Sequence, residues 1–255
     1  MKKIAVVTVC YNIESQILDT MKSVLDQDYT NFEYIIIDGD SKDGTLEKIK
    51  ETISKYPSRT IKLISEKDSG VYDAMNKGIR LTNSEWIIFM NAGDLFYSSN
   101  VLNSFDEYLT ENNDVVYGEV IYSHNKYGYR KVECRKLETI KENMPFCHQS
   151  TFTKSKLLKE CEFNVKYKIC SDYDFFYKMY QNNKKFVEIR KVVAIYDIDG
   201  ISSNYLKNRT EKYKINKDKK ILFNISFYYI KAFIKFFIPK KILYKYKYRD
   251  FSKSC

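Results

Sequence analysis

The sequence predicts an α/β fold with a mostly parallel sheet and helices on both of its faces. Over roughly the first 95 residues, short apolar runs rich in β-branched residues alternate with segments whose apolar side chains recur at helical spacing. The runs at 32–38 and 86–90 each lead into an acidic loop, at 38–41 and 91–94. Carboxylates just past the carboxyl ends of strands are typical of ligand crevices in open α/β sheets.

The elements of the first half follow in order from the hydrophobic pattern. Short apolar runs predict strands at 4–9, 32–38, 61–65 and 86–90. Apolar residues that share one face predict helices at about 17–25, 45–56 and 71–81. Strand–helix alternation of this kind predicts βαβ units. No G-x-x-x-x-G-K-[ST] or G-x-G-x-x-G string occurs, so a P-loop or a dinucleotide-binding turn is not supported.

The pattern of the second half is less regular. Residues 100–112 and 171–180 are expected to be helical. Strands are expected at 115–122 and 129–134, joined by a polar turn, and one or two more at 186–196. The stretch 144–153 mixes apolar and polar residues and carries no clear period.

The charge and the cysteines limit the class of protein. The net charge of +10 is uneven, because residues 201–255 hold 15 Lys and Arg against 3 Asp and Glu, whereas residues 1–200 hold 28 against 30. A nearly neutral body argues against a nucleic-acid-binding domain and assigns the excess charge to a tail with an anionic partner. None of the six cysteines forms a C-x-x-C pair, which favours reduced thiols over a zinc ribbon or a disulfide framework.

The last 50 residues have their own pattern. Between 221 and 238, polar residues form one helical stripe and apolar residues lie away from it. Lysines, an arginine and tyrosines alternate after Pro239. We expect a basic amphipathic helix at 221–238, which Pro239 ends, and a basic aromatic segment after it. Residues 221–255 together would lie on an anionic membrane surface, where each lysine contributes about 1 kcal/mol. The alternative is a helix packed on the core or on a second subunit.

Six strings spread over the first 175 residues carry a resemblance to a known family. They lie at 8–12, 37–45, 65–78, 89–94, 147–150 and 171–175. The most specific are D-G-x-S-x-D-G-T at 38–45 and G-V-Y-D-A-M-N-K-G at 70–78. With them, residues 1–205 resemble a family 2 glycosyltransferase of the subgroup in bacterial surface-polysaccharide assembly. The resemblance implies the Rossmann-like GT-A fold, with a nucleotide-sugar half at 1–98, an acceptor half at 99–205 and a basic aromatic tail at 206–255.

The resemblance implies a nucleotide-sugar site, with UDP favoured because most relatives use it. The residues expected to contact the nucleotide are Thr8, Tyr11, Asn12, Asp38, Asp40, Asp68, Asn76 and Asn91. Among them, Asp38 would accept hydrogen bonds from the uracil or the ribose, since a carboxylate is an acceptor only.

The resemblance also implies a divalent metal, Mn²⁺ or Mg²⁺. Asp94 matches the last acid of the metal-binding motif and would hold the ion against the diphosphate. The family usually has Asp where this chain has Asn91 and Gly93, which leaves one ionised ligand in the motif.

Asp172 matches the catalytic acid of the family, although Ser171 stands where a Glu usually precedes it. The expected role is general base toward an acceptor hydroxyl that attacks the anomeric carbon and inverts it. His148, Gln149 and Asp174 are expected to contact the acceptor or a phosphate. The Q-x-x-R-W string of processive members is missing, which favours transfer of a single sugar.

The expected function is therefore metal-dependent sugar transfer to a lipid-diphosphate-linked glycan. We expect a cytoplasmic enzyme that is peripheral at the inner face of the membrane. We expect no nucleic-acid partner, and a homodimer is one possible assembly. Two alternatives stay open: a sugar nucleotidyltransferase, and a non-catalytic module that binds nucleotide sugar or membrane. The sequence does not specify the sugar or the acceptor hydroxyl.

Overall fold

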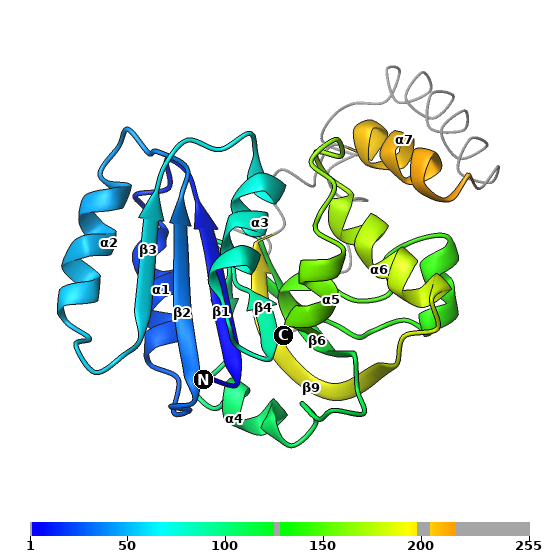
Figure 1. Ribbon diagram of the computed structural model, residues 1–255, viewed down its shortest axis with the longest axis horizontal. Helices are drawn as coiled ribbons and strands as arrows, with labels where there is room; N and C mark the ends of the chain where they lie inside the picture. The colour runs from blue at the N-terminus through cyan, green and yellow to red at the C-terminus, as the bar shows by residue number, and fades with distance from the viewer. Residues whose placement is uncertain (1, 125–127, 198–204, 218–255) are drawn as a thin grey trace.

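The computed structural model describes residues 2–124, 128–197 and 205–217. In these ranges nine strands form one sheet in the order β3-β2-β1-β4-β8-β6-β9-β5, and β7 pairs with β6 (Figure 1). The strands β1 to β4 are parallel, β8 is antiparallel to both β4 and β6, and β9 is parallel to β6. The expected mostly parallel sheet is confirmed.

The bounds of the elements are as follows. The strands are β1 Ile4–Cys10, β2 Phe32–Asp38, β3 Ile61–Ser65, β4 Trp86–Phe89, β5 Leu95–Phe96, β6 Val115–His124, β7 Gly128–Val132, β8 Thr151–Lys154 and β9 Phe186–Asp197. The helices are α1 Ile17–Leu25, α2 Thr45–Ser54, α3 Val71–Leu81, α4 Val101–Asp106, α5 Ser155–Glu160, α6 Ser171–Gln181 and α7 Tyr205–Asn216, with 3₁₀ turns η1 Leu137–Lys141 and η2 His148–Ser150.

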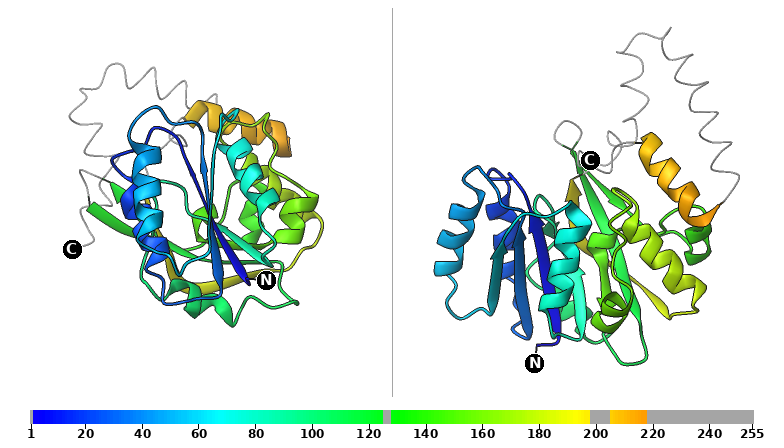
Figure 2. Two further views of the ribbon diagram at one scale, coloured as in Figure 1. Left: turned by 60° about the vertical axis from the view of Figure 1, so that its left-hand side comes forward. Right: turned by 45° about the horizontal axis from the view of Figure 1, so that its top comes forward.

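The sheet separates two hydrophobic cores, and β1 shows how. Its alternate residues Ile4 and Val6 join the core under α1, α2 and α4, whereas Ala5 and Val7 join the core under α3, α5 and α6. Side chains alternate across a strand, so a continuous apolar run buries both faces. Figure 2 shows helices on both sides of the sheet. The prediction of helices on both faces is therefore confirmed.

The second half departs from the sequence pattern in three places. The helix expected at 100–112 is α4, which ends at Asp106. The unassigned stretch at 144–153 contains η2 and the start of β8, and β8 lies between β4 and β6. The segment 186–196 is one continuous strand, β9, which contacts β6 with a register shift near Glu119.

The proposed membrane segment, 221–255, lies outside the described residues. Residues 205–216 form α7, which lies beside α6 in Figure 1. Among the described helices, none is long and apolar enough to cross a membrane. The domain boundary at 205 stays a prediction.

Glu33 ties three segments together at the amino-terminal side of the sheet. Oε1 accepts hydrogen bonds from Thr82 Oγ1 at 2.5 Å and Ser84 Oγ at 2.8 Å, and Oε2 pairs with Lys62 Nζ at 2.7 Å. Burial by itself would raise the pKa of Glu33, but these hydrogen bonds outweigh it and lower the pKa below its usual value.

A carboxylate with a lowered pKa stabilises the fold above its unfolded pKa, and this contribution is lost as pH falls through the folded pKa. We therefore expect Glu33→Gln to lower the free energy of unfolding at pH 7 by about 1–3 kcal/mol. The difference from wild type should narrow below the ordinary pKa of 4.5. Urea unfolding at several pH values measures it, with the exposed Glu47→Gln as control. A deficit independent of pH would contradict the ionic role.

Candidate active site

The carboxyl ends of β2, β1 and β4 lie side by side and bring three loops together. In the register of β1 with β2, Cys10 lies opposite Asp38. The backbone N–H of Gly39 donates to Cys10 O at 2.9 Å, and that of Ala92 donates to Val9 O at 3.2 Å. The loops that follow these strands therefore share one edge of the sheet, as expected for two acidic loops in an α/β fold.

Asp38 is fully buried at this edge and is held by serines. Oδ1 accepts from Ser41 Oγ at 2.5 Å, and Oδ2 accepts from Ser65 Oγ at 2.6 Å and from Ser41 N at 3.2 Å. The Cys10 thiol also lies 3.8 Å from Oδ1, as a weak donor that a ligand N–H or O–H could replace. The burial and the fixed rotamer give a directional acceptor at the edge of the sheet.

Tyr11, Asn12 and Asp68 surround this carboxylate. A Cβ added to Gly39 would lie 2.5 Å from Asp68 Oδ2 and 3.3 Å from Tyr11 Cδ2, so these side chains meet over the Gly39 backbone. Tyr11 is 61% exposed, which leaves its ring face available to a base. Asn12 adopts a left-handed conformation, and its Oδ1 accepts from the backbone N–H of Lys42 at 2.8 Å.

Three other residues expected to contact the nucleotide make hydrogen bonds or an ion pair with other residues of the protein. Thr8 is fully buried and donates to Met90 O at 2.7 Å. Asn76 is also buried and makes two hydrogen bonds to the backbone of Phe163, at 2.8 and 2.9 Å. Asp40 pairs with Lys42 at 2.6 Å in an exposed ion pair. The observed contacts of these three residues are therefore with the protein itself. Their contacts with a nucleotide stay predictions.

Asp94 is the buried acid of the second loop. Oδ2 accepts from Gln149 Nε2 at 3.0 Å, and Oδ1 accepts from Asp197 N at 3.3 Å. Burial raises the pKa of Asp94 to about 7. The buried Oδ1 of Asn91, three residues before it, has no hydrogen-bond partner. Three oxygens of this loop, Asn91 Oδ1 and both carboxylate oxygens of Asp94, thus have unused acceptor capacity.

Gly93 explains why this loop lacks the further acid of the family motif. Its φ is 101°, which lies in the region that favours glycine. An added Cβ would lie 2.6 Å from Gln16 Oε1. An aspartate at position 93 would therefore have a strained backbone, and the flexible Gln16 side chain would have to move aside.

Asp172 lies in the first turn of α6 between a tyrosine and a histidine. Tyr72 Oη donates to Asp172 Oδ1 at 2.9 Å and also lies 2.7 Å from Ile169 O. His148 Nδ1 is 3.5 Å from Asp172 Oδ2. Burial lowers the pKa of His148, although the charge of Asp172 opposes this effect, and the buried Nε2 has no partner. The contacts therefore fix the carboxylate of Asp172 in one orientation.

The turn η2 joins the two acidic centres. His148 contacts Asp172, and the next residue, Gln149, binds Asp94. The expected base, Asp172, and the expected metal ligand, Asp94, are thus each contacted by one of two consecutive residues. Asp174 is placed differently, since its buried carboxylate accepts from Lys178 Nζ at 2.7 Å on the same helix.

Sequence reasoning did not identify Tyr72, Ser65 or Asp197 as site residues. Tyr72 lies within the G-V-Y-D-A-M-N-K-G string, but its partner Asp172 is 100 positions away. Ser65 ends β3, whose pairing with β2 brings it beside Asp38. The resemblance strings could have drawn attention to Tyr72 and Ser65, whereas no pattern marks Asp197.

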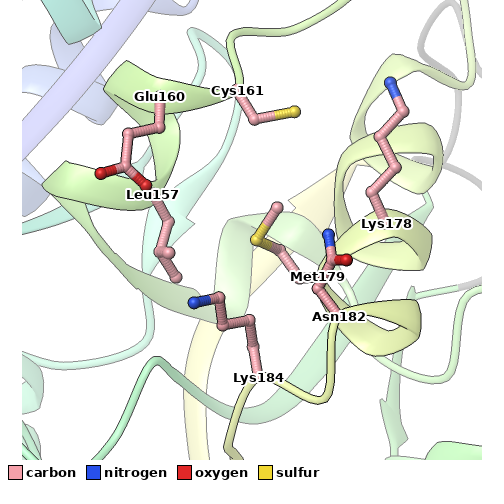
Figure 3. Close-up of a pocket in the computed structure, with 7 residues that line it drawn as sticks. All are labelled: Leu157, Glu160, Cys161, Lys178, Met179, Asn182 and Lys184. Atoms are coloured by element: carbon pink, nitrogen blue, oxygen red, sulfur yellow. The ribbon is translucent and has the colours of Figure 1, made fainter.

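A separate pocket of about 450 Å³ lies between α5 and the carboxyl-terminal end of α6 (Figure 3). Its lining residues are Leu157, Glu160, Cys161, Lys178, Met179, Asn182 and Lys184. This pocket includes none of the expected site residues.

Comparison with known families decides the class of this site. The profile of "Glycosyl transferase family 2" matches residues 5–234. The chain belongs to glycosyltransferase family 2. This glycosyltransferase is 29% identical over 203 residues to the PGL/p-HBAD biosynthesis glycosyltransferase of Mycobacterium bovis, and the match covers 78% of each protein. It is 26% identical over 214 residues to the minor teichoic acid biosynthesis protein GgaB of Bacillus subtilis, covering 78% of this chain and 23% of GgaB.

Solved structures show the same fold at low identity. S. aureus TarS 1-349 in complex with UDP-GlcNAc superposes with a TM-score of 0.68 at 20% identity, covering 84% of this chain and 64% of TarS 1-349. The mannosyltransferase PcManGT from Pyrobaculum calidifontis, in complex with GDP-Man and Mn²⁺, superposes with a TM-score of 0.64 at 16% identity, covering 84% and 61%. The GT-A fold expected from the sequence is confirmed, and the protein is a glycosyltransferase.

Proposed function

We propose that this glycosyltransferase moves one sugar from a nucleotide sugar to a hydroxyl of a glycan acceptor, with inversion at the anomeric carbon. The observation that carries the proposal is the placement of Asp172 by Tyr72 and His148, next to the Gln149–Asp94 contact. A partly exposed carboxylate, 19% accessible at its side chain and held by two neighbours, suits a general base that a substrate hydroxyl must reach.

Asp172 and its two neighbours, Tyr72 and His148, would have different roles in the reaction. Asp172 takes the proton of the acceptor hydroxyl as that oxygen attacks the anomeric carbon. The hydroxyl of Tyr72 donates to Oδ1 and His148 Nδ1 lies 3.5 Å from Oδ2, so the remaining lone pairs of the carboxylate would take the acceptor proton. Burial keeps His148 neutral, so its ring positions Asp172 without a competing positive charge. Attack from the side opposite the nucleotide gives the inverted product.

The nucleotide end would be bound by the loops after β1, β2 and β4. Asp38 offers a buried acceptor for the uracil or the ribose, and the exposed ring of Tyr11 offers a stacking face. UDP is the favoured nucleotide because TarS is solved with UDP-GlcNAc, although PcManGT is solved with GDP-Man.

The donor set fits a divalent cation that keeps part of its water shell. The orphaned Oδ1 of Asn91 and the carboxylate of Asp94 are hard oxygen ligands, and Mg²⁺ or Mn²⁺ commonly combines one or two such groups with waters and phosphate oxygens. Within the described ranges, no three His, Cys, Asp or Glu side chains gather as a complete metal cluster. When bound, the ion supplies charge stabilisation for the departing diphosphate. Asn91 and Asp94 would hold it.

We further propose a lipid-diphosphate-linked acceptor at the inner face of the cell membrane, in the assembly of a bacterial surface polysaccharide. The match to a teichoic acid biosynthesis protein supports the class of product. The basic residues of 221–255 would approach anionic lipid. Flotation of the full chain and of a chain ending at 220 with anionic liposomes tests this, and equal recovery of both would reject the tail's role.

The test of the reaction is a screen of nucleotide sugars with Mg²⁺ or Mn²⁺ and a lipid-diphosphate-linked acceptor. We expect release of a free nucleoside diphosphate and a product whose anomeric configuration, measured by NMR coupling constants, is opposite to that of the donor. Pyrophosphate release would indicate a nucleotidyltransferase instead. Retention of configuration would contradict direct attack.

Asp94→Asn tests the metal end separately. We expect the gain in UDP affinity that Mn²⁺ provides to fall by at least the roughly 10- to 100-fold that outer contacts of a metal site contribute. The affinity for UDP without metal should stay unchanged, because Asp38 and Tyr11 are untouched. Isothermal calorimetry with and without Mn²⁺ measures both. An undiminished effect of Mn²⁺ in the variant would remove Asp94 from the metal site.

A further inference from the structure

Glu211 on α7 is a buried carboxylate whose backbone donors come from another segment. The residue is 7% exposed. Oε1 accepts from Lys168 N at 2.9 Å, and Oε2 accepts from Ile169 N at 2.9 Å and Cys170 N at 3.0 Å. These three donors directly precede α6, which begins at Ser171. One side chain of α7 thus holds the backbone that leads into the helix of Asp172.

One of these three contacts, with the N–H of Cys170, lies at the N-cap of α6, and the other two hold the residues before it. The first N–H groups of a helix have no partner within it, and an acidic group there also interacts favourably with the helix dipole. Cys170 is the N-cap residue of α6, and its side chain makes no capping hydrogen bond. Glu211 supplies acceptors and negative charge at this end, 41 positions later in the chain.

A second attachment of α7 lies just after Asp172. Asn216 Nδ2 donates to Tyr173 Oη at 3.0 Å and to Lys141 O at 2.8 Å. The ammonium of Lys212 lies 5.5 Å from the centre of the Tyr173 ring. The segment that carries Asp172 is therefore fixed by α7 on both sides, and Figure 1 shows the two helices next to each other.

We propose that α7 is a clamp for the catalytic segment and that Glu211 is a positioning residue for Asp172. This inference rests on the proposed role of Asp172 as base. Misplacement of a reacting group by 1 Å can cost about 100-fold in rate. Within the described residues, the hydrogen bonds of Glu211 go to the backbone of 168–170 and not to the loops after β1, β2 and β4, which would bind the nucleotide. Its loss should therefore lower turnover and spare donor binding.

Glu211→Gln tests the clamp. The amide keeps one acceptor and turns N–H groups toward backbone donors. We expect kcat to fall about tenfold or more, while KM for the nucleotide sugar stays within about twofold. Glu47→Gln, an exposed carboxylate in the first turn of α2, is the matched control and should keep the wild-type kcat. Asn216→Ala breaks the second attachment without touching Glu211, should also lower kcat, and carries the test if Glu211→Gln does not fold.

Asp172→Asn in the same series separates two failures. An active Asp172→Asn overturns the proposed base, and the clamp loses its purpose with it. With Asp172→Asn inactive, wild-type kcat in both Glu211→Gln and Asn216→Ala overturns the clamp alone. Thermal melts measure the fraction of each variant that is folded. If the fall in kcat equals the fall in this fraction, the clamp is also overturned, because a purely structural contact would have the same effect.

Discussion

Asp172→Asn is expected to lower the rate of sugar transfer by about 10²- to 10⁴-fold, which is the usual contribution of a general base. The amide has the same shape, and its oxygen can still accept from Tyr72 Oη, so the geometry of α6 should persist. The amide cannot take a proton from the acceptor hydroxyl. The affinity for UDP should therefore change by less than about threefold. Release of nucleoside diphosphate under saturating donor and acceptor measures the rate, and calorimetry measures the affinity.

The matched control for this variant is Asp19→Asn, an exposed acid in the first turn of α1. It removes the same charge from the first turn of another helix without touching the site, and wild-type turnover is expected. An Asp172→Asn enzyme with most of its activity would assign the base elsewhere. A parallel loss of UDP affinity would instead make Asp172 a donor-binding residue.

Tyr72→Phe refines the same assignment. Loss of the hydroxyl removes the donor to Oδ1 and leaves the 3.5 Å contact of Oδ2 with His148, so the orientation of Asp172 becomes less fixed. The resulting fall in turnover should be smaller than that of Asp172→Asn, since the base itself remains. This ordering of the two variants follows from a positioning role for Tyr72.

The sequence predicts the first half of the fold well, for a physical reason. The strands β1, β2 and β4 are buried on both faces, so each is a continuous apolar run that stands out from its polar flanks. The second half lacks this signal. The strand β8 is four residues long and has only Phe152 as a large apolar side chain. It is buried because it lies between β4 and β6, and its own sequence does not show this.

The site divides in the same way. Asp38 and Asp94 could be placed by the ends of strands, since parallel strands bring their following loops together. The contacts that orient Asp172 join positions 72, 148 and 172, and no local period reports such a meeting. The role of Glu211 is still harder to predict, because it is one acid in a segment whose positive net charge indicates a basic tail. Side chains that act across long separations become visible only with the tertiary structure.

Asp38→Ala is expected to have the second large effect, on both binding and stability. The carboxylate accepts hydrogen bonds from Ser41 and Ser65 and would accept another from the nucleoside. Hydrogen bonds to a charged group contribute about 1.5–3 kcal/mol each, so the affinity for UDP should fall by about 10- to 100-fold and the free energy of unfolding by a few kcal/mol. Calorimetry with UDP and urea unfolding measure the two effects.

Ser65→Ala separates them. It removes one internal donor to Asp38 and leaves the carboxylate in place. The free energy of unfolding should fall by about 1.5–3 kcal/mol, the contribution of one hydrogen bond to a charged group. The affinity for UDP should stay near wild type, because the carboxylate that would bind the nucleoside is still present. If Ser65→Ala and Asp38→Ala weaken UDP binding equally, the loop geometry rather than the carboxylate recognises the nucleoside. If Asp38→Ala binds UDP like wild type, the buried acid serves only to hold the β2 and β3 ends together.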